Sequence, residues 1–204
     1  MQYKILGKDL KVSSIGMGCM GISHAYGKPL TKKEGIYLIH KALDYGYNFF
    51  DTAEVYGPYI NEEIVGEALK NHHGKVVIAT KFGVKLEDGS TGMPIASAKS
   101  DIIRKSIESS LKRLQVDCID LYYQHRIDPK IAPEEVASLM ADLIKEGKIS
   151  HWGISQVDEI YLRRANAICP VTAIQNRYSM MARDYEKLFP VLEELNIGFV
   201  AFSP

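Results

Sequence analysis

Polar side chains that can do chemistry stand where apolar, strand-like runs of the sequence end. The side chains at these run ends are Asp51, Lys81, His125, Ser155, Gln175 and Ser203. In a barrel of parallel strands, all such ends surround one mouth, and barrels of this kind carry their active sites there. Residues that lie far apart in the sequence are therefore expected to meet in one pocket.

Strand-like and helix-like segments alternate along the chain and would position these side chains. The predicted strands are 14–18, 48–51, 76–81, 118–124, 149–155, 171–175 and 198–203. The predicted helices are 31–45, 61–71, 101–114, a segment from Pro133 to Gly147, 158–166 and 185–195. A hairpin of 3–5 with 10–12 precedes them. Regular alternation favours an α/β fold with a parallel sheet flanked by helices, and no linker divides 1–204, so we predict a single domain.

Local signals support the boundaries of several helices. Thr31 with Glu34 three residues later forms a capping-box pattern. Ser100 is expected to cap the helix that begins at Asp101. Pro133 suits the first position of a helix. A long loop rich in Gly, Ser and Pro is expected before Lys99.

A glycine pattern near the N-terminus invites a different interpretation. Residues 16–21 read Gly-Met-Gly-Cys-Met-Gly, a G-x-G-x-x-G match after a strand. In a dinucleotide-binding fold the third glycine would open a helix directly. Here Gly27 and Pro29 follow and the first credible helix cap is Thr31, so we interpret the pattern as a strand-to-loop turn at the barrel mouth.

Composition excludes several functional classes. The 204 residues carry 25 basic and 25 acidic side chains, so the net charge is zero and gives no case for nucleic acid or an anionic membrane as a partner. No apolar run approaches the roughly 20 residues that cross a bilayer. The three cysteines are too few and too far apart to indicate disulfides or a metal site. A cytoplasmic protein is the simplest expectation, and the oligomeric state stays open.

Several motifs together resemble those of the aldo-keto reductases across essentially the whole chain. They are Asp-Thr-Ala-Glu-Val-Tyr-Gly at 51–57, Ala-Thr-Lys-Phe-Gly at 79–83, Tyr-Tyr-Gln-His at 122–125, Glu-Gly-Lys-Ile at 146–149 and Gly-Ile-Ser at 153–155. Gly-Cys-Met-Gly at 18–21 and Tyr-Gln-His-Arg at 123–126 look like the bacterial and plant branch often called auxin-induced or perakine-reductase-like. The resemblance implies a (β/α)8 TIM barrel and an oxidoreductase that reduces an aldehyde or ketone to an alcohol.

The family's catalytic tetrad falls on Asp51, Tyr56, Lys81 and His125. Reduction of a carbonyl needs a hydride at carbon, which a nicotinamide cofactor supplies, and a proton at oxygen. A phenol is a weak acid at neutral pH, and an adjacent ammonium makes the proton leave more readily. The resemblance therefore implies that Tyr56 donates the proton and that Lys81, paired with Asp51, assists it. His125 would bind and orient the carbonyl oxygen.

The same matching implies the cofactor-binding residues and the cofactor, NADPH, with NADH left open. Asp51 belongs to this set as well as to the tetrad. The other matched residues are Cys19 and Met20 by the nicotinamide ribose, Ser155 and Gln175 at the carboxamide, Phe202 against the ring and Ser203 in the loop toward the pyrophosphate. Gln156 stands where the family often has Asn, so it stays outside this set. No metal is implied.

The family pattern also has elements that these 204 residues do not contain. They are an eighth strand, further helices, a substrate-shaping loop and a basic segment for the adenosine 2′-phosphate of NADPH. We therefore expect an incomplete portion of a longer reductase, with two unpaired sheet edges. Side chains that could face a carbonyl substrate are Tyr26, Tyr59, Phe82 and Arg126.

Two other functions fit the residues less well. One is a cofactor-binding or regulatory module, or an inactive fragment, with little turnover. The other is a Schiff-base aldolase that uses Lys81.

Overall fold

A computed structural model describes residues 1–23, 27–85 and 95–204. Seven strands form its main sheet: β3 (Met17–Gly18), β4 (Phe49–Asp51), β5 (Val77–Phe82), β8 (Ile119–Gln124), β9 (Ile149–Ser155), β10 (Ala173–Arg177) and β11 (Gly198–Phe202). All neighbouring pairs are parallel, in the order β11-β10-β9-β8-β5-β4-β3. Seven parallel strands in chain order confirm the predicted sheet.

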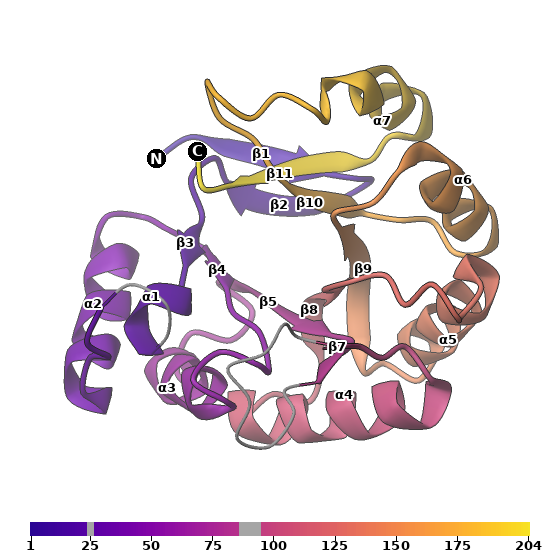
Figure 1. Ribbon diagram of the computed structural model, residues 1–204. Coiled ribbons are helices and arrows are strands. Elements are labelled where there is room, and N and C mark those ends of the chain that lie inside the picture. Colours follow the sequence, from indigo (N-terminus) through magenta and orange to yellow (C-terminus); the bar gives the residue numbers. More distant parts are fainter. Residues whose placement is uncertain (24–26, 86–94) are drawn as a thin grey trace.

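Helices lie outside this curved sheet. They are α1 (Met20–Ser23), α2 (Lys32–Asp44), α3 (Ile60–Leu69), α4 (Ser100–Leu114), α5 (Pro133–Lys145), α6 (Glu159–Ile168) and α7 (Phe189–Leu195), with a 3-10 turn η1 (Glu186–Leu188) before α7. Figure 1 shows α2 to α7 arranged around the strands. Because an outer helix follows each strand from β3 to β10 of the main sheet, the inner face of the sheet is left to the strands' own side chains.

Alternation along the strands divides the buried side chains into two clusters. On β5, Val77 and Ala79 belong to the inner cluster, whereas Ile78 and Phe82 pack with the helices in the outer one. The inner cluster is narrow: a Cβ at Gly153 would come within 2.6 Å of the Tyr123 ring. Side chains at the inward positions of the strands therefore meet along one axis.

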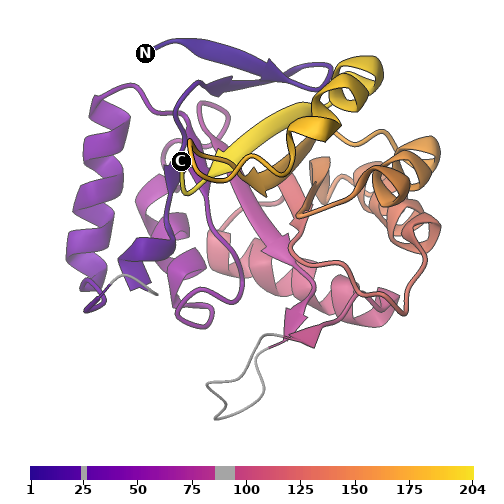
Figure 2. The ribbon, with the colours of Figure 1, turned by 45° about the horizontal axis from the view of Figure 1, so that its top comes forward.

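A hairpin closes one end of the strands. β1 (Tyr3–Leu6) pairs antiparallel with β2 (Leu10–Ser13), as predicted. Leu6, Leu10 and Val12 join the inner cluster beneath Phe49 and Val77, which start their strands. Figure 2 shows the hairpin at the end opposite to β6 (Val84–Lys85) and β7 (Ile95–Ala96). The carboxyl ends of the strands are thus left for the site.

Local signals explain most helix starts, with one error. Thr31 and Glu34 form the reciprocal capping box, and Asp158 accepts the N–H of Tyr161 at 2.8 Å. Ser100, by contrast, is the first residue of α4 and Lys99 occupies the cap position without a side-chain bond, so the predicted Ser100 cap is wrong.

The other differences between the predicted and the observed elements are small. The first sheet strand covers only Met17–Gly18, and the chain just after it forms the one-turn helix α1 rather than a plain loop. β10 begins and ends two residues later than predicted. The predicted long loop contains the two-residue strands β6 and β7. Among the described residues, no helix is both long and apolar enough to cross a membrane.

Candidate active site

Asp51 and Lys81 occupy inward positions on adjacent strands, which places them together at the carboxyl end of the sheet. Asp51 is the last residue of β4 and pairs in register with Ala79, two residues before Lys81. The Lys81 side chain is 1% exposed and ion-pairs with Asp51 Oδ1. A charge this buried is stable only with a partner of opposite charge.

Two more acceptors complete the surroundings of the Lys81 ammonium. Its Nζ donates to the carbonyl oxygen of Thr52 at 2.7 Å and lies 3.5 Å from the Tyr56 hydroxyl. Burial alone would lower the pKa of Lys81, but the charges and hydrogen bonds of Asp51 and Tyr56 outweigh it and raise that pKa. Lys81 is therefore a fixed ammonium that faces the Tyr56 oxygen.

Gln175 contacts the tetrad rather than standing apart from it. Its Nε2 donates to Asp51 Oδ2 at 2.8 Å, and its side chain is buried. Asp51 thus has one oxygen on Lys81 and the other on Gln175. Ser155, which pairs in register with Gln175, is buried beside it on β9. The hydroxyl of Ser155 has no hydrogen-bond partner among the described residues, so it is available to a ligand.

His125 follows β8 and faces Tyr56 across the mouth. The two rings meet edge to face with centroids 6.0 Å apart. Burial holds the pKa of His125 well below its usual range, and the nearby Lys81 and Arg126 cations add to the effect. The imidazole is therefore neutral at neutral pH. Its Nδ1 is buried without a partner in the described part of the chain.

The other candidate cofactor residues lie at the ends of β3 and β11. Cys19 is buried, its N–H donates to the Asp51 carbonyl at 2.7 Å, and its own carbonyl accepts from the Asn61 amide at 2.9 Å. Burial and Asp51 raise the pKa of its thiol to about 12, so the thiol stays protonated. Met20 is half-buried at the start of α1. Phe202 ends β11 half-exposed, and Ser203 follows with φ +50°. Among the described residues, no hydrogen bond or ring contact joins Phe202 or Ser203 to the tetrad.

The residues at the mouth suit a nicotinamide group. A Cβ placed on Gly18, which pairs with Asp51, would meet no atom within 4 Å, so this strand end leaves room for a ligand against the backbone. The buried Ser155 hydroxyl and the Gln175 amide supply a donor and acceptor set that suits a carboxamide.

An outer layer of polar side chains behind the tetrad was not predicted. Thr80 donates to the fully buried Glu62 at 2.6 Å, and Arg113 pairs with Glu62 at 2.6 Å. Ser106 donates to Glu54. The signal in the sequence is the alternation along β5, which turns Thr80 outward between Ala79 and Lys81 and leaves it in need of a polar partner.

The four residues predicted to face a substrate have different surroundings. Phe82 is fully buried and packs on Tyr122, with ring centroids 4.7 Å apart, in the outer cluster, so it does not face the mouth. Tyr59 is exposed, with the Arg113 guanidinium 4.6 Å from its ring centroid, and its role toward a substrate stays a prediction. Tyr26 lies outside the described residues. Arg126 is half-buried beside His125, to whose carbonyl it donates at 2.6 Å. Burial lowers the pKa of Arg126, and the nearby Tyr56 and Tyr185 oppose that shift only in part.

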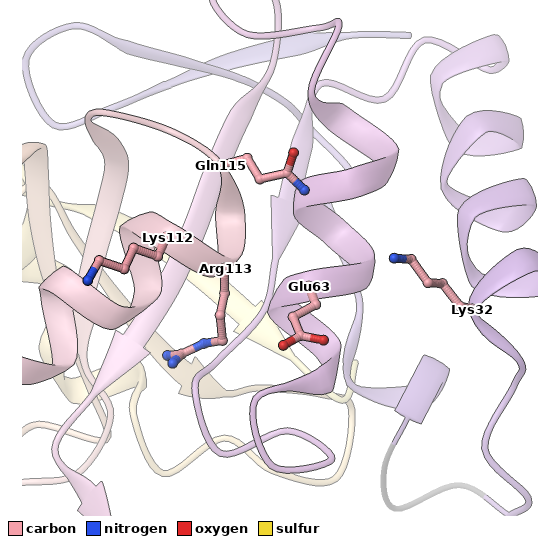
Figure 3. A pocket seen from close by; sticks show the side chains of 5 residues that line it. All are labelled: Lys32, Glu63, Lys112, Arg113 and Gln115. Atoms are coloured by element: carbon pink, nitrogen blue, oxygen red, sulfur yellow. The ribbon is translucent and has the colours of Figure 1, made fainter.

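A separate cavity of about 300 Å³ lies on the outside of the sheet, between α2, α3 and α4. Figure 3 shows its lining side chains, Lys32, Glu63, Lys112, Arg113 and Gln115. Arg113 is already paired with Glu62. None of the tetrad residues lines this cavity, so it is distinct from the candidate active site.

The comparisons with known proteins all point to the same family. The model of the aldo/keto reductase family matches residues 14–204. A probable aldo-keto reductase 1 of Glycine max is 42% identical over 98% of the chain. An aldo-keto reductase of Bacillus halodurans, in its holo form, has a TM-score of 0.89 at 30% identity over 98% of the chain. One of Klebsiella pneumoniae, in complex with NADP and acetate, has a TM-score of 0.76 at 27% identity over 97% of the chain.

These likenesses confirm the predicted α/β barrel of the TIM type without its eighth strand. The chain spans 58% of the Glycine max protein, 65% of the Bacillus halodurans chain and 66% of the Klebsiella pneumoniae chain.

Proposed function

The chain belongs to the aldo/keto reductase family, and we propose that it supplies the catalytic tetrad of an NADPH-dependent reductase that converts an aldehyde or ketone into an alcohol. The observation that carries the proposal is the buried Lys81 ammonium held between Asp51 and the Tyr56 hydroxyl. An ammonium fixed 3.5 Å from a phenol oxygen stabilises the negative charge that appears there when the proton leaves.

Tyr56 is the proton donor in this proposal. When bound, the nicotinamide cofactor supplies the hydride for the carbonyl carbon. The O–H bond of Tyr56 breaks, its proton forms the new O–H bond of the alcohol, and the resulting phenolate faces Lys81. Asp51 acts through Lys81, because it holds that ammonium in place and balances its charge.

His125 orients the carbonyl. A neutral imidazole has one N–H to donate, and its ring faces Tyr56. A carbonyl oxygen between the two side chains would accept hydrogen bonds from both, which fixes the position of its carbon. Ser155, Gln175 and Phe202 are proposed to hold the nicotinamide, Cys19 and Met20 to approach its ribose by their backbones, and Ser203 to lead toward the pyrophosphate.

NADPH is proposed because the Klebsiella pneumoniae relative is in complex with NADP. Titration of nicotinamide fluorescence with NADPH and with NADH compares the two cofactors directly.

The Schiff-base alternative fits the site less well. An aldolase lysine must lose its proton before it attacks a carbonyl. The raised pKa of Lys81, with Asp51 and Tyr56 against it, keeps the amine protonated. Failure of borohydride to trap a substrate on Lys81 would agree with this.

The decisive experiment compares Tyr56→Phe with the unchanged protein. Oxidation of NADPH by a panel of aldehydes is expected to fall by about 10²–10⁴-fold in kcat, the usual size of acid–base catalysis. Binding of NADPH should be unchanged, because the substitution removes one hydroxyl. Tyr45→Phe, at an exposed tyrosine directly after α2, is the matched control. A Tyr56→Phe variant with full turnover would contradict the proposal, and absence of turnover in the unchanged protein would favour a binding module.

A further inference from the structure

We propose that Glu54 is a positioning residue for the reaction: its carboxylate ties the loop that carries Tyr56 to helix α4, and so holds the Tyr56 phenol beside Lys81. The inference rests on the proposed function for the role of Tyr56. The link itself is a set of contacts that can be tested without turnover.

The loop of residues 52–59 joins β4 to α3 and needs external support. Its start is fixed by Thr52, whose N–H donates to Ala79 at 2.8 Å and whose hydroxyl donates to Asn61 at 2.7 Å. Its end is strained, because Tyr59 has φ +70° without being a glycine. Tyr56 lies between these two points, so its position depends on what holds the middle of the loop.

Glu54 connects the middle of the loop to two other elements. Its N–H donates to the Lys81 carbonyl at 3.4 Å, and its carbonyl accepts the Tyr59 N–H at 2.9 Å. Its carboxylate accepts the hydroxyl of Ser106 on α4. Glu54 thus connects the loop to the strand that carries Lys81 by its backbone N–H and to the helix behind it by its carboxylate.

The partner of Glu54 is itself fixed. Ser106 is almost fully buried, and its hydroxyl lies 3.0 Å from the hydroxyl of Tyr122 on β8. Because Ser106 donates to Glu54, it accepts from Tyr122. Burial raises the pKa of Tyr122 well above its ordinary value, so its phenol remains a donor. The Tyr122 ring packs on Phe82, the neighbour of Lys81.

The strength of the link depends on the charge of Glu54. Burial raises the pKa of Glu54 to about 7, and Glu62 of α3 adds to the rise; the Ser106 hydroxyl, Arg113 of α4 and the Gly83 N–H oppose it. A carboxylate is a stronger acceptor than a carboxylic acid or an amide. The link is therefore strongest above pH 7.

The test compares Glu54→Gln, Glu54→Ala and Ser106→Ala with the surface control Glu63→Gln. Hydrogen exchange of the amides in 52–59 reports the link directly, because those of Glu54, Tyr56 and Tyr59 are bonded there. We expect faster exchange in this segment for Glu54→Ala and Ser106→Ala, with the double variant no faster than either. In kcat we expect a fall of about tenfold or more for Glu54→Ala, since small displacements of a catalytic group are costly.

The pH profiles of Tm and of kcat distinguish a positioning role of Glu54 from simple structural support. Because folding raises the pKa of Glu54 above its ordinary 4.5, the folded protein binds the extra proton, and this carboxyl costs stability as pH rises from about 4.5 to about 7. Glu54→Gln removes that cost, so its Tm relative to the unchanged protein should be higher at pH 8 than at pH 5. Its kcat relative to the unchanged protein should change in the opposite direction.

The inference would be overturned if Glu54→Ala had the same amide exchange in 52–59 and the same kcat profile as the unchanged protein. It would also be overturned if the kcat and the Tm of Glu54→Gln, each relative to the unchanged protein, changed in the same direction with pH. Absence of turnover in the unchanged protein would count against the proposed function instead, and the exchange measurement would still decide whether Glu54 holds the loop.

Discussion

At the scale of single residues, the site depends on how each buried charge is compensated. Lys81 is enclosed by Asp51, the Thr52 carbonyl and Tyr56, so its charge is retained. His125 is held neutral because burial lowers its pKa and the nearby Lys81 and Arg126 cations lower it further. The same strand ends therefore hold one group charged and another neutral, which is the separation that an acid–base site requires.

Arg126 is a half-buried cation at the mouth, and among the described residues no carboxylate lies within 4 Å of it. An aldehyde that carries a carboxylate could make a charge-assisted hydrogen bond there, worth about 1.5–3 kcal/mol. For Arg126→Ala we expect kcat/KM to fall about 10-fold or more for such substrates and much less for neutral aldehydes of similar size. Arg104→Ala, on the surface of α4, is the control. Equal losses for both substrate classes would contradict this role.

At the scale of elements, close packing of α3 on α4 places the outer polar layer behind the tetrad. A Cβ at Gly66 of α3 would overlap the carbonyl of Arg113 and lie 2.7 Å from the Leu114 Cα, so only backbone could move to admit it. At Gly35 of α2 a Cβ would meet the side-chain methyl groups of Ile22 and Ile64, at 2.8 and 2.9 Å.

These two glycines give a matched pair of substitutions. Gly66→Ala is expected to lower the free energy of unfolding by about 1–3 kcal/mol, the usual cost of overpacking. Gly35→Ala should cost less, because side chains can rotate and because alanine favours a helix by about 1 kcal/mol over glycine. Urea unfolding of both variants measures the difference. An equal cost at the two sites would show that α3 and α4 can separate easily.

Elements with strong local signals were predictable. The capping box of Thr31 and the run 149–155 match the observed helix and strand. The Ser100 cap failed because Lys99 has the extended backbone of a cap and the helix therefore starts one residue earlier. The one-turn helix α1 has no sequence periodicity that could have revealed it.

At the scale of the whole molecule, the arrangement of the tetrad was predictable because strand ends of a parallel barrel converge. The partners of the tetrad were harder to predict. That Gln175 contacts Asp51, and that Phe82 faces away from the mouth, depends on which face of each strand looks inward. A shift of one residue reverses every side chain of a strand, and the sequence boundaries carry an uncertainty of that size.

The sheet also has two edges in the part of the chain that the structure describes. β3 and β11 each have only one neighbour. Beside β11 lies a cavity of about 350 Å³ lined by apolar side chains that include Phe189, Leu192 and Phe199. An unpaired strand next to an apolar surface tends to pair with another chain. We therefore expect the 204-residue protein to associate as its concentration rises.

A charge on the edge should weaken this association, because pairing would bury it. Ala201 is exposed on β11, whereas Ala167 is exposed on α6, away from both edges. In sedimentation velocity, Ala201→Lys should shift the protein toward monomer at a concentration where the unchanged protein associates, and Ala167→Lys, which adds the same charge, should not. If both lysines act alike, the association depends on net charge and not on β11. If neither acts, the contact lies elsewhere on the molecule.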